Sequence, residues 1–136
     1  AFLQNVNNVF DVMWNKERKY GELRLQEELE LSVYDFDLAD AQACREMFDL
    51  NEREALRLLE TYPGEKEDAA ARRRFPLLAI FEYCLKCSHL FNILDARGAI
   101  SVTERVALIA RIRRLSCRVA SLYVERNSPV LEAQTA

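Results

Sequence analysis

Residues 94–104 read LDARGAISVTE, and this stretch decides the fold because it joins two helices through a connection of only a few residues. Gly98 is placed for the left-handed backbone conformation that closes a helix at its C-terminus. Ser101 and Glu104 have the spacing of a capping box, in which each side chain accepts a hydrogen bond from the other residue's backbone N–H. The sequence therefore predicts a helix ending near Asp95, a tight corner, and a helix beginning after Ser101.

The helices on the two sides of this corner differ in their apolar patterns. The preceding helix, predicted from Pro76 to about Asp95, is apolar on most sides, which favours a place at the centre of the domain. The following helix is predicted to fray near Arg126. Its inner face is assigned to a stripe of six residues: Val102, Val106, Ile109, Ile112, Val119 and Tyr123. Its opposite, basic face is assigned to Arg111, Arg114 and Arg118.

The N-terminal quarter of the chain gives a less uniform pattern. Apolar residues at helical spacing predict a helix over residues 2–14. Residues 15–21 are polar and end in a predicted turn. Residues 23–33 alternate between leucine or valine and polar residues, yet they are rich in glutamate, so a short helix and an extended connector both remain open.

A further helix is predicted from the apolar stripe that follows these residues. Asp37 or Asp40 can cap its N-terminus, because a carboxylate accepts hydrogen bonds from the unpaired N–H groups of a first turn. The helix should end near Tyr62, since Pro63 cannot continue it. Residues 65–74 carry no packing signal and are predicted to be a charged loop or a frayed turn.

Composition agrees with an all-α fold. Half of the 136 residues are apolar and 30% are charged, whereas glycine and proline number three each, which suits long helices better than a turn-rich β structure. We expect a compact bundle of about four main helices with short connectors, forming one domain over residues 1–126 with a tail at 127–136. Because the chain begins at Ala1, already inside a predicted helix, we expect a domain excised from a longer protein.

Charge and hydropathy bound the possible partners. Residues 17–68 hold 16 acidic and 7 basic residues, net −9, whereas residues 69–126 hold 11 basic and 4 acidic residues, net +7. Either the two halves attract each other, or the basic half receives an acidic or polyanionic partner. The longest apolar run, residues 76–81, is too short for a membrane span, and no signal peptide is visible. The expected location is the cytoplasm, where cysteines stay reduced.

The sequence offers little chemistry for catalysis. Cys84 and Cys87 form a CxxC pair followed by His89, but Cys44 and Cys117 are isolated and do not complete a zinc site. A redox pair of this kind would need a preceding strand, and buried cysteine also serves as a small apolar residue. No phosphate-binding loop or metal motif is present. We therefore expect no catalytic residue, metal or cofactor in this chain.

Polar residues near the corner are candidates for interaction rather than catalysis. His89, the only histidine, lies on a mostly apolar helix, where a buried structural role is favoured over a contact with a partner. Asp95 and Arg97 are close enough to pair with each other. The full set of interaction candidates is His89, Asn92, Asp95, Arg97, Arg105, Arg111, Arg114 and Arg118. Gly98, Ser101 and Glu104 are assigned to capping.

A longer string around the corner resembles a known family. Residues 88–105, SHLFNILDARGAISVTER, resemble the "SHxFNLLDARGAISVTER" string of the bacterial glycyl-tRNA synthetase α subunit, and residues 109–113 match its "IxRIR" segment. Residues 9–14 resemble its "VYDLVW" helix, and residues 20–36 resemble its "YGD…QNEVEQSxYNFE" stretch. Within that stretch, residues 27–31 read EELEL where the family has polar amides. The resemblance covers roughly residues 2–125.

The resemblance implies a C-terminal helical region of a class II aminoacyl-tRNA synthetase. In that family the catalytic core, which binds glycine, ATP and Mg²⁺, lies upstream, so this chain is expected to be inactive alone. The resemblance also implies that the parent enzyme is an α₂β₂ assembly with an α–α dimer, or a chain with a fused β region, in which the β part provides most tRNA recognition. The implied role is to join the catalytic core to the β subunit and to tRNA(Gly). The alternative from the residues alone is a stand-alone nucleic-acid-binding module that uses the last two helices as a helix-turn-helix.

Overall fold

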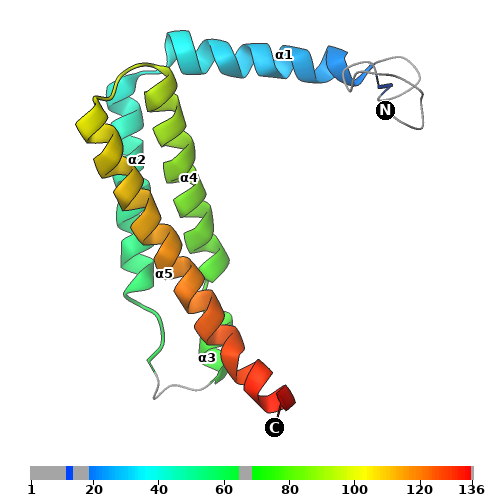
Figure 1. The fold of residues 1–136 in the computed structure, drawn as a ribbon, viewed down its shortest axis with the longest axis vertical. Coiled ribbons are helices and arrows are strands. Elements are labelled where there is room, and N and C mark those ends of the chain that lie inside the picture. The colour runs from blue at the N-terminus through cyan, green and yellow to red at the C-terminus, as the bar shows by residue number, and fades with distance from the viewer. Residues whose placement is uncertain (1–11, 14–18, 65–68, 136) are drawn as a thin grey trace. The chain divides into compact units, whose positions relative to one another are not determined.

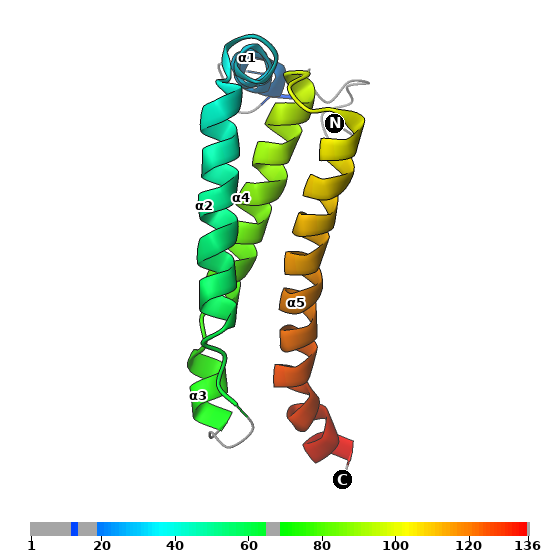
Figure 2. The ribbon, with the colours of Figure 1, turned by 90° about the vertical axis from the view of Figure 1, so that its left-hand side faces the viewer.

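The computed structural model describes residues 12–13, 19–64 and 69–135, which form two compact units, Ala1–Ala39 and Asp40–Ala136 (Figures 1 and 2). Within these described residues the regular elements are all helices, and the only β interaction is an isolated bridge between Met13 and Lys19. The all-α prediction is therefore confirmed, with four main helices. The prediction of one domain over residues 1–126, with a tail after it, stays a prediction.

The first unit contains α1, Tyr20–Val33, which runs on into the π-helical turn η3, Tyr34–Leu38. At its start, the Glu22 carboxylate accepts a 3.2 Å hydrogen bond from the backbone N–H of Lys19, which satisfies one of the unpaired donors there. The helical alternative for residues 23–33 is thus confirmed. The turn predicted at Gly21 is wrong, because α1 already includes this residue.

The helix predicted over residues 2–14 falls mostly outside the described residues. Val12 lies in a bend, and Met13 pairs with Lys19 in the antiparallel bridge, so the prediction is wrong at these two positions. A local backbone pairing there replaces the helical hydrogen bonds that the apolar spacing suggested.

The second unit opens with α2, Ala41–Leu59. Asp40 is its N-cap, and its carboxylate accepts a 2.7 Å hydrogen bond from the N–H of Ala43, which decides between the two predicted caps. The other candidate, Asp37, lies in η3. The buried face of α2 consists of Cys44, Phe48, Ala55 and Leu59.

The connection after α2 is more structured than the sequence suggested. Residues 69–74 form a short helix, α3 (Ala69–Arg74), so the loop alternative for this stretch is wrong at these residues. Phe75, which follows it, is buried, and its ring meets the Tyr62 ring edge to face at 4.9 Å between centroids. This aromatic contact anchors the connection to the end of α2.

The central helix is α4, Leu77–Ala96, which packs against both α2 and α5. Figure 2 shows α4 between these two neighbours. Its buried residues are Leu77, Ile80, Cys84, Cys87, Leu90, Ile93 and Leu94. By length and hydropathy alone, the helical stretch Ala69–Ala96 passes as a candidate membrane span. The central helix of a soluble protein passes the same test, and α4 holds that place in this unit.

The corner between α4 and α5 has the predicted geometry. Gly98 has a φ of 67°, its N–H donates to the Asp95 carbonyl, and the Ala99 N–H donates to the Leu94 carbonyl, both at 3.0 Å. These two bonds form a Schellman motif. The Ser101 hydroxyl oxygen accepts from the N–H of Glu104 at 3.1 Å and caps α5, Val102–Thr135. The predicted fraying near Arg126 is wrong, because α5 continues for nine more residues.

Candidate functional site

The face of α5 that enters the core differs from the predicted one. Its buried residues are Leu108, Leu115, Val119 and Leu122. Of the predicted inner stripe only Val119 is buried, whereas Val102 and Val106 are 76% and 64% exposed. The helix carries two apolar stripes at helical spacing, and apolar spacing cannot tell which of them faces the core. Ion pairs between α5 and α2 accompany the orientation in which the stripe of buried residues, here called the leucine stripe, faces the core.

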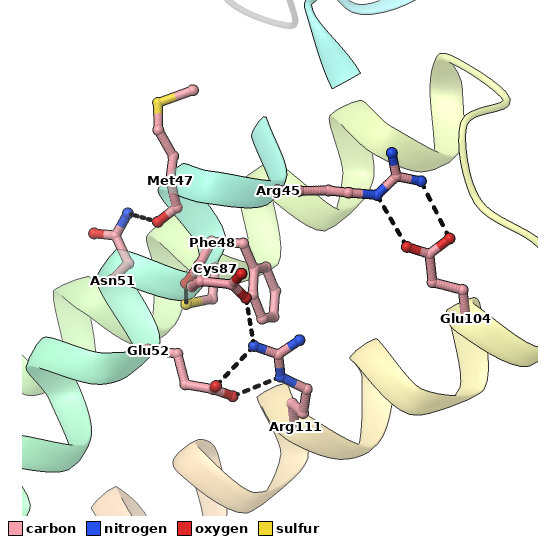
Figure 3. Close-up of polar contacts among 9 residues, drawn as sticks. Arg45, Met47, Phe48, Asn51, Glu52, Cys87, Glu104 and Arg111 are labelled. Carbon is pink, nitrogen blue, oxygen red and sulfur yellow. Dashed lines mark hydrogen bonds and ion pairs between the residues drawn. The ribbon is translucent and has the colours of Figure 1, made fainter. Parts of the chain in front are cut away.

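The most extensive of these ion pairs joins Arg111 of α5 to Glu52 and Asp49 of α2 (Figure 3). Arg111 Nε lies 2.9 Å from Glu52 Oε2, and Nη2 lies 2.8 Å from Glu52 Oε1 and 2.7 Å from Asp49 Oδ1. The guanidinium also stacks over the Phe48 ring, 4.7 Å from its centroid. Hydrogen bonding to Glu52 is the main cause that raises the pKa of Arg111. Its predicted place on the exposed basic face is therefore wrong, because it is a bridge between helices.

A second arginine, Arg45 of α2, ties α2 to the corner. Its Nε and Nη2 donate to the Glu104 carboxylate at 3.0 and 3.2 Å (Figure 3). Nη2 also donates to the Ala99 carbonyl at 2.5 Å. The Arg45 hydrogen bond is the main cause that lowers the pKa of Glu104, and the Ser101 backbone N–H contributes to the same shift. Glu104 thus does more than capping. The sequence analysis did not single out Arg45, a basic residue of the acidic half that pairs with an acidic residue of the basic half.

The predicted interaction candidates near the corner separate into three groups. Asp95 forms an ion pair with Arg105 across the corner, and Arg97 is exposed beside them. Asn92 is exposed and lines a cavity between α4 and α5. His89 is exposed, so its favoured assignment to the core is wrong. Interaction with a partner stays a prediction for all five residues.

The CxxC pair serves to pack helices. The Cys84 sulfur lies 3.1 Å from the Ser116 hydroxyl of α5, and the Cys87 thiol donates to the Phe48 carbonyl of α2 at 3.7 Å. Burial is the main cause that raises the pKa of Cys87 to about 12. Such a thiol is protonated at neutral pH and is a poor nucleophile. Among the residues described, no group of three or more His, Cys, Asp or Glu side chains is placed to hold a metal ion.

An open apolar trough lies between α4 and α5, and the sequence did not predict it. Two cavities of about 430 and 370 Å³ meet at Ser116, which lines both of them. The larger is lined by Leu77, Leu78, Phe81, Ser116, Val119, Ala120, Tyr123, Val124 and Arg126. The smaller is lined by Ser88, Phe91, Asn92, Ile109, Ile112, Arg113 and Ser116. The second apolar stripe of α5 was the available signal, because it belongs to this trough rather than to the core.

The exposed basic face of α5 differs from the predicted one by one residue, because it contains Arg113 in place of Arg111. Arg114 and Arg118 are exposed, as predicted, and with Arg113 they line a hollow of about 760 Å³ whose other lining residues are Leu56, Ala110 and Cys117. Within the described part of the chain, no ion pair to any of these three arginines is found. We call Arg113, Arg114 and Arg118 the basic face below.

The fold and these surfaces can be compared with a known protein family. The family model described as glycyl-tRNA synthetase alpha subunit matches residues 1–128, nearly the whole chain. The match includes the corner string, both helices that line the trough, and the basic face. This chain therefore belongs to the glycyl-tRNA synthetase alpha subunit family.

Proposed function

We propose that residues 40–135 form a non-catalytic docking element, which joins the catalytic core of the synthetase to its beta subunit and to tRNA. Membership of the family assigns the chain to glycyl-tRNA aminoacylation, and an alpha subunit associates with a beta subunit in the parent enzyme. The proposal adds that this helical unit makes the connection. It also takes the parent enzyme to be a cytoplasmic assembly that contains an α–α dimer.

The observation that carries the docking role is the apolar trough between α4 and α5. Large apolar side chains gathered on an open surface mark a binding site more often than isolated ones do. The framework around the trough suits this role, because the Arg111–Glu52 and Arg45–Glu104 pairs and the Schellman corner hold α5 in place. A surface held in a fixed shape loses less conformational entropy on binding.

Hydrogen exchange on the alpha subunit, with and without the beta subunit, tests this docking role. We expect amides of residues 77–127 to exchange more slowly in the complex, because bound surface is shielded and held in its folded state. The proposal is wrong if the complex forms and no amide in residues 40–135 gains protection.

Catalysis is proposed to reside outside these 136 residues. The polar clusters of the described helices are ion pairs between arginine and carboxylate side chains, and they serve packing. The isolated chain should therefore not support exchange of pyrophosphate into ATP in the presence of glycine and Mg²⁺. Any exchange above that of a blank would overturn this part of the proposal.

Contact with tRNA is supported by the basic face. Exposed arginines without an acidic partner are suited to phosphate contacts, each of which releases counterions and makes affinity depend on salt. The double variant Arg114→Gln, Arg118→Gln should weaken tRNA binding by the enzyme and reduce the slope of log affinity against log salt by about 2. An unchanged slope would show that tRNA does not contact the basic face.

The alternative of a stand-alone helix-turn-helix module is not supported. The helices of that motif cross at a steep angle, so that the second enters the major groove. Here α4 and α5 run antiparallel and pack against each other, as Figures 1 and 2 show. The family match also places the chain within a synthetase subunit.

A further inference from the structure

The trough has the composition of an unfilled helix-packing site. Four large apolar side chains are exposed along its larger cavity: Leu78 at 71%, Val124 at 62%, Tyr123 at 57% and Phe81 at 42%. They come from both helices, so the larger cavity is an apolar groove between two antiparallel neighbours. A further helix can fit its side chains between those of such a pair.

The length of the trough sets the length of its occupant. The lining residues on α5 extend from Ile109 to Arg126. At a rise of 1.5 Å per residue this stretch is about 26 Å long, which corresponds to about five helical turns. An occupant of about 17 residues in helical conformation would cover it.

The charges along the trough indicate which sign of charge the occupant carries. Among the lining residues that the structure describes, the charged ones are two arginines, Arg113 beside the smaller cavity and Arg126 beside the larger one. The Arg126 guanidinium lies over the Tyr123 ring, 5.8 Å from its centroid. Glu82 and Lys86, two exposed charged residues of α4, line neither cavity. A helix with acidic residues beside its apolar stripe complements this surface.

We infer that the trough between α4 and α5 binds an amphipathic helix of the beta subunit, with an apolar stripe that enters the groove and Asp or Glu residues that meet Arg113 and Arg126. This inference rests on the proposed docking function and names its contact surface. Apolar burial supplies most of the affinity, whereas the two arginines fix the direction in which the helix lies.

Two other occupants fit the surface less well. A second copy of this face would bring Arg113 and Arg126 from both molecules into one interface, where the described lining holds no carboxylate to pair with them. RNA would leave the apolar floor in contact with a charged backbone, and only one member of the basic face, Arg113, lines the trough.

The test uses the complete alpha and beta subunits and measures their affinity by isothermal titration calorimetry. The first variant, Leu78→Glu with Val124→Glu, places charge on the apolar floor at two exposed positions. Its matched control, Leu50→Glu, makes the same change on α2 at a residue that is 53% exposed and lines neither cavity. We expect at least a tenfold loss of affinity in the variant and less than a twofold change in the control, with both proteins retaining the helical circular dichroism of the parent.

The second variant, Arg126→Glu, tests the charge of the occupant. Its control is Arg53→Glu, at an exposed residue of α2 that lines neither cavity. Repulsion of acidic residues should weaken binding about tenfold at low salt and less at high salt, whereas the control should bind as the parent does. Equal losses of affinity in Arg126→Glu and in Arg53→Glu, or no loss in Arg126→Glu, would overturn the inference that the partner helix is acidic.

The outcomes separate this inference from the docking function on which it rests. Protection of residues 40–135 by the beta subunit, combined with unchanged affinity of the Leu78→Glu, Val124→Glu variant, would overturn the trough as the contact surface and leave docking intact. Absence of protection would overturn both. If the variant instead dissociates an alpha dimer in sedimentation experiments and keeps its affinity for the beta subunit, the occupant is a second copy and the inference is wrong.

Discussion

Arg111 of α5 and Glu52 of α2 form a two-bond ion pair, with N–O distances of 2.9 and 2.8 Å, directly above the Phe48 ring. The Glu52 side chain is 18% exposed and the Arg111 side chain 28%, so both are partly withdrawn from water. Together with the Arg45–Glu104 pair, it links α2 to α5, which otherwise make few contacts with each other. It also turns the leucine stripe of α5 inward and leaves the second apolar stripe beside the trough.

Replacing Arg111 with methionine should destabilise the fold. The change removes hydrogen bonds to two carboxylates and leaves Glu52 partly buried without a partner, which should lower the free energy of unfolding by about 2 kcal/mol. Urea denaturation followed by circular dichroism measures the difference. The control is Arg57→Met, which breaks a pair within α2 whose arginine is 61% exposed, and there we expect a loss of at most about 0.5 kcal/mol. Equal losses in the two variants would contradict this account.

Replacing Gly98 with alanine tests the corner. Its φ of 67° is strained for any residue with a Cβ atom, although no atom lies within 4 Å of the place where that Cβ would be. Backbone strain alone should therefore cost about 1 kcal/mol of unfolding free energy. Gly64→Ala is the matched control, since that position also has open space and no positive φ, and it should be neutral or slightly stabilising. Thermal or urea unfolding of both variants gives the comparison.

Local signals predicted the helix caps of this corner and of α2 well, because each cap is formed by residues close together in the sequence. Gly98, Ser101 and Asp40 each form the contact that their residue type and position predicted. The orientation of α5 was not predictable in this way. Its two apolar stripes have the same helical period, and the choice between them depends on Arg45 and Arg111 meeting residues at least 54 positions away in the sequence.

The candidate site shows the same limit. Charge spacing placed Arg111, Arg114 and Arg118 on one face, but tertiary contacts withdrew Arg111 to pair with α2. His89 was assigned to the core because its helix is apolar on most sides, yet even a central helix keeps one side exposed, and His89 is on that side. The trough was missed because its apolar residues had been assigned to the core.

The four cysteines should differ in reactivity. Cys44, Cys84 and Cys87 are buried, and burial raises the pKa of Cys87 to about 12, so its thiolate is scarce at neutral pH. Cys117 is exposed on α5 and should be the thiol that reacts rapidly with Ellman's reagent in the folded chain. In denaturant all four should react. A Cys117→Ser variant provides the control, and rapid reaction of its remaining thiols under native conditions would contradict the packing described for α4.

The Arg45–Glu104 pair predicts how stability depends on pH. Hydrogen bonding from Arg45 holds the folded-state pKa of Glu104 below its ordinary value of 4.5, so the folded protein binds this proton less readily than the unfolded chain. The resulting stabilisation is fully present above pH 4.5 and is lost as the pH falls through the lower folded-state pKa. Urea midpoints measured across this range should fall more steeply for the parent than for Glu104→Gln, which cannot titrate. Glu54 has a pKa lowered by Arg57 within one helix, so Glu54→Gln controls for the loss of a carboxylate that does not join helices. Parallel curves for the parent and Glu104→Gln would show that the Arg45 contact does not persist in solution.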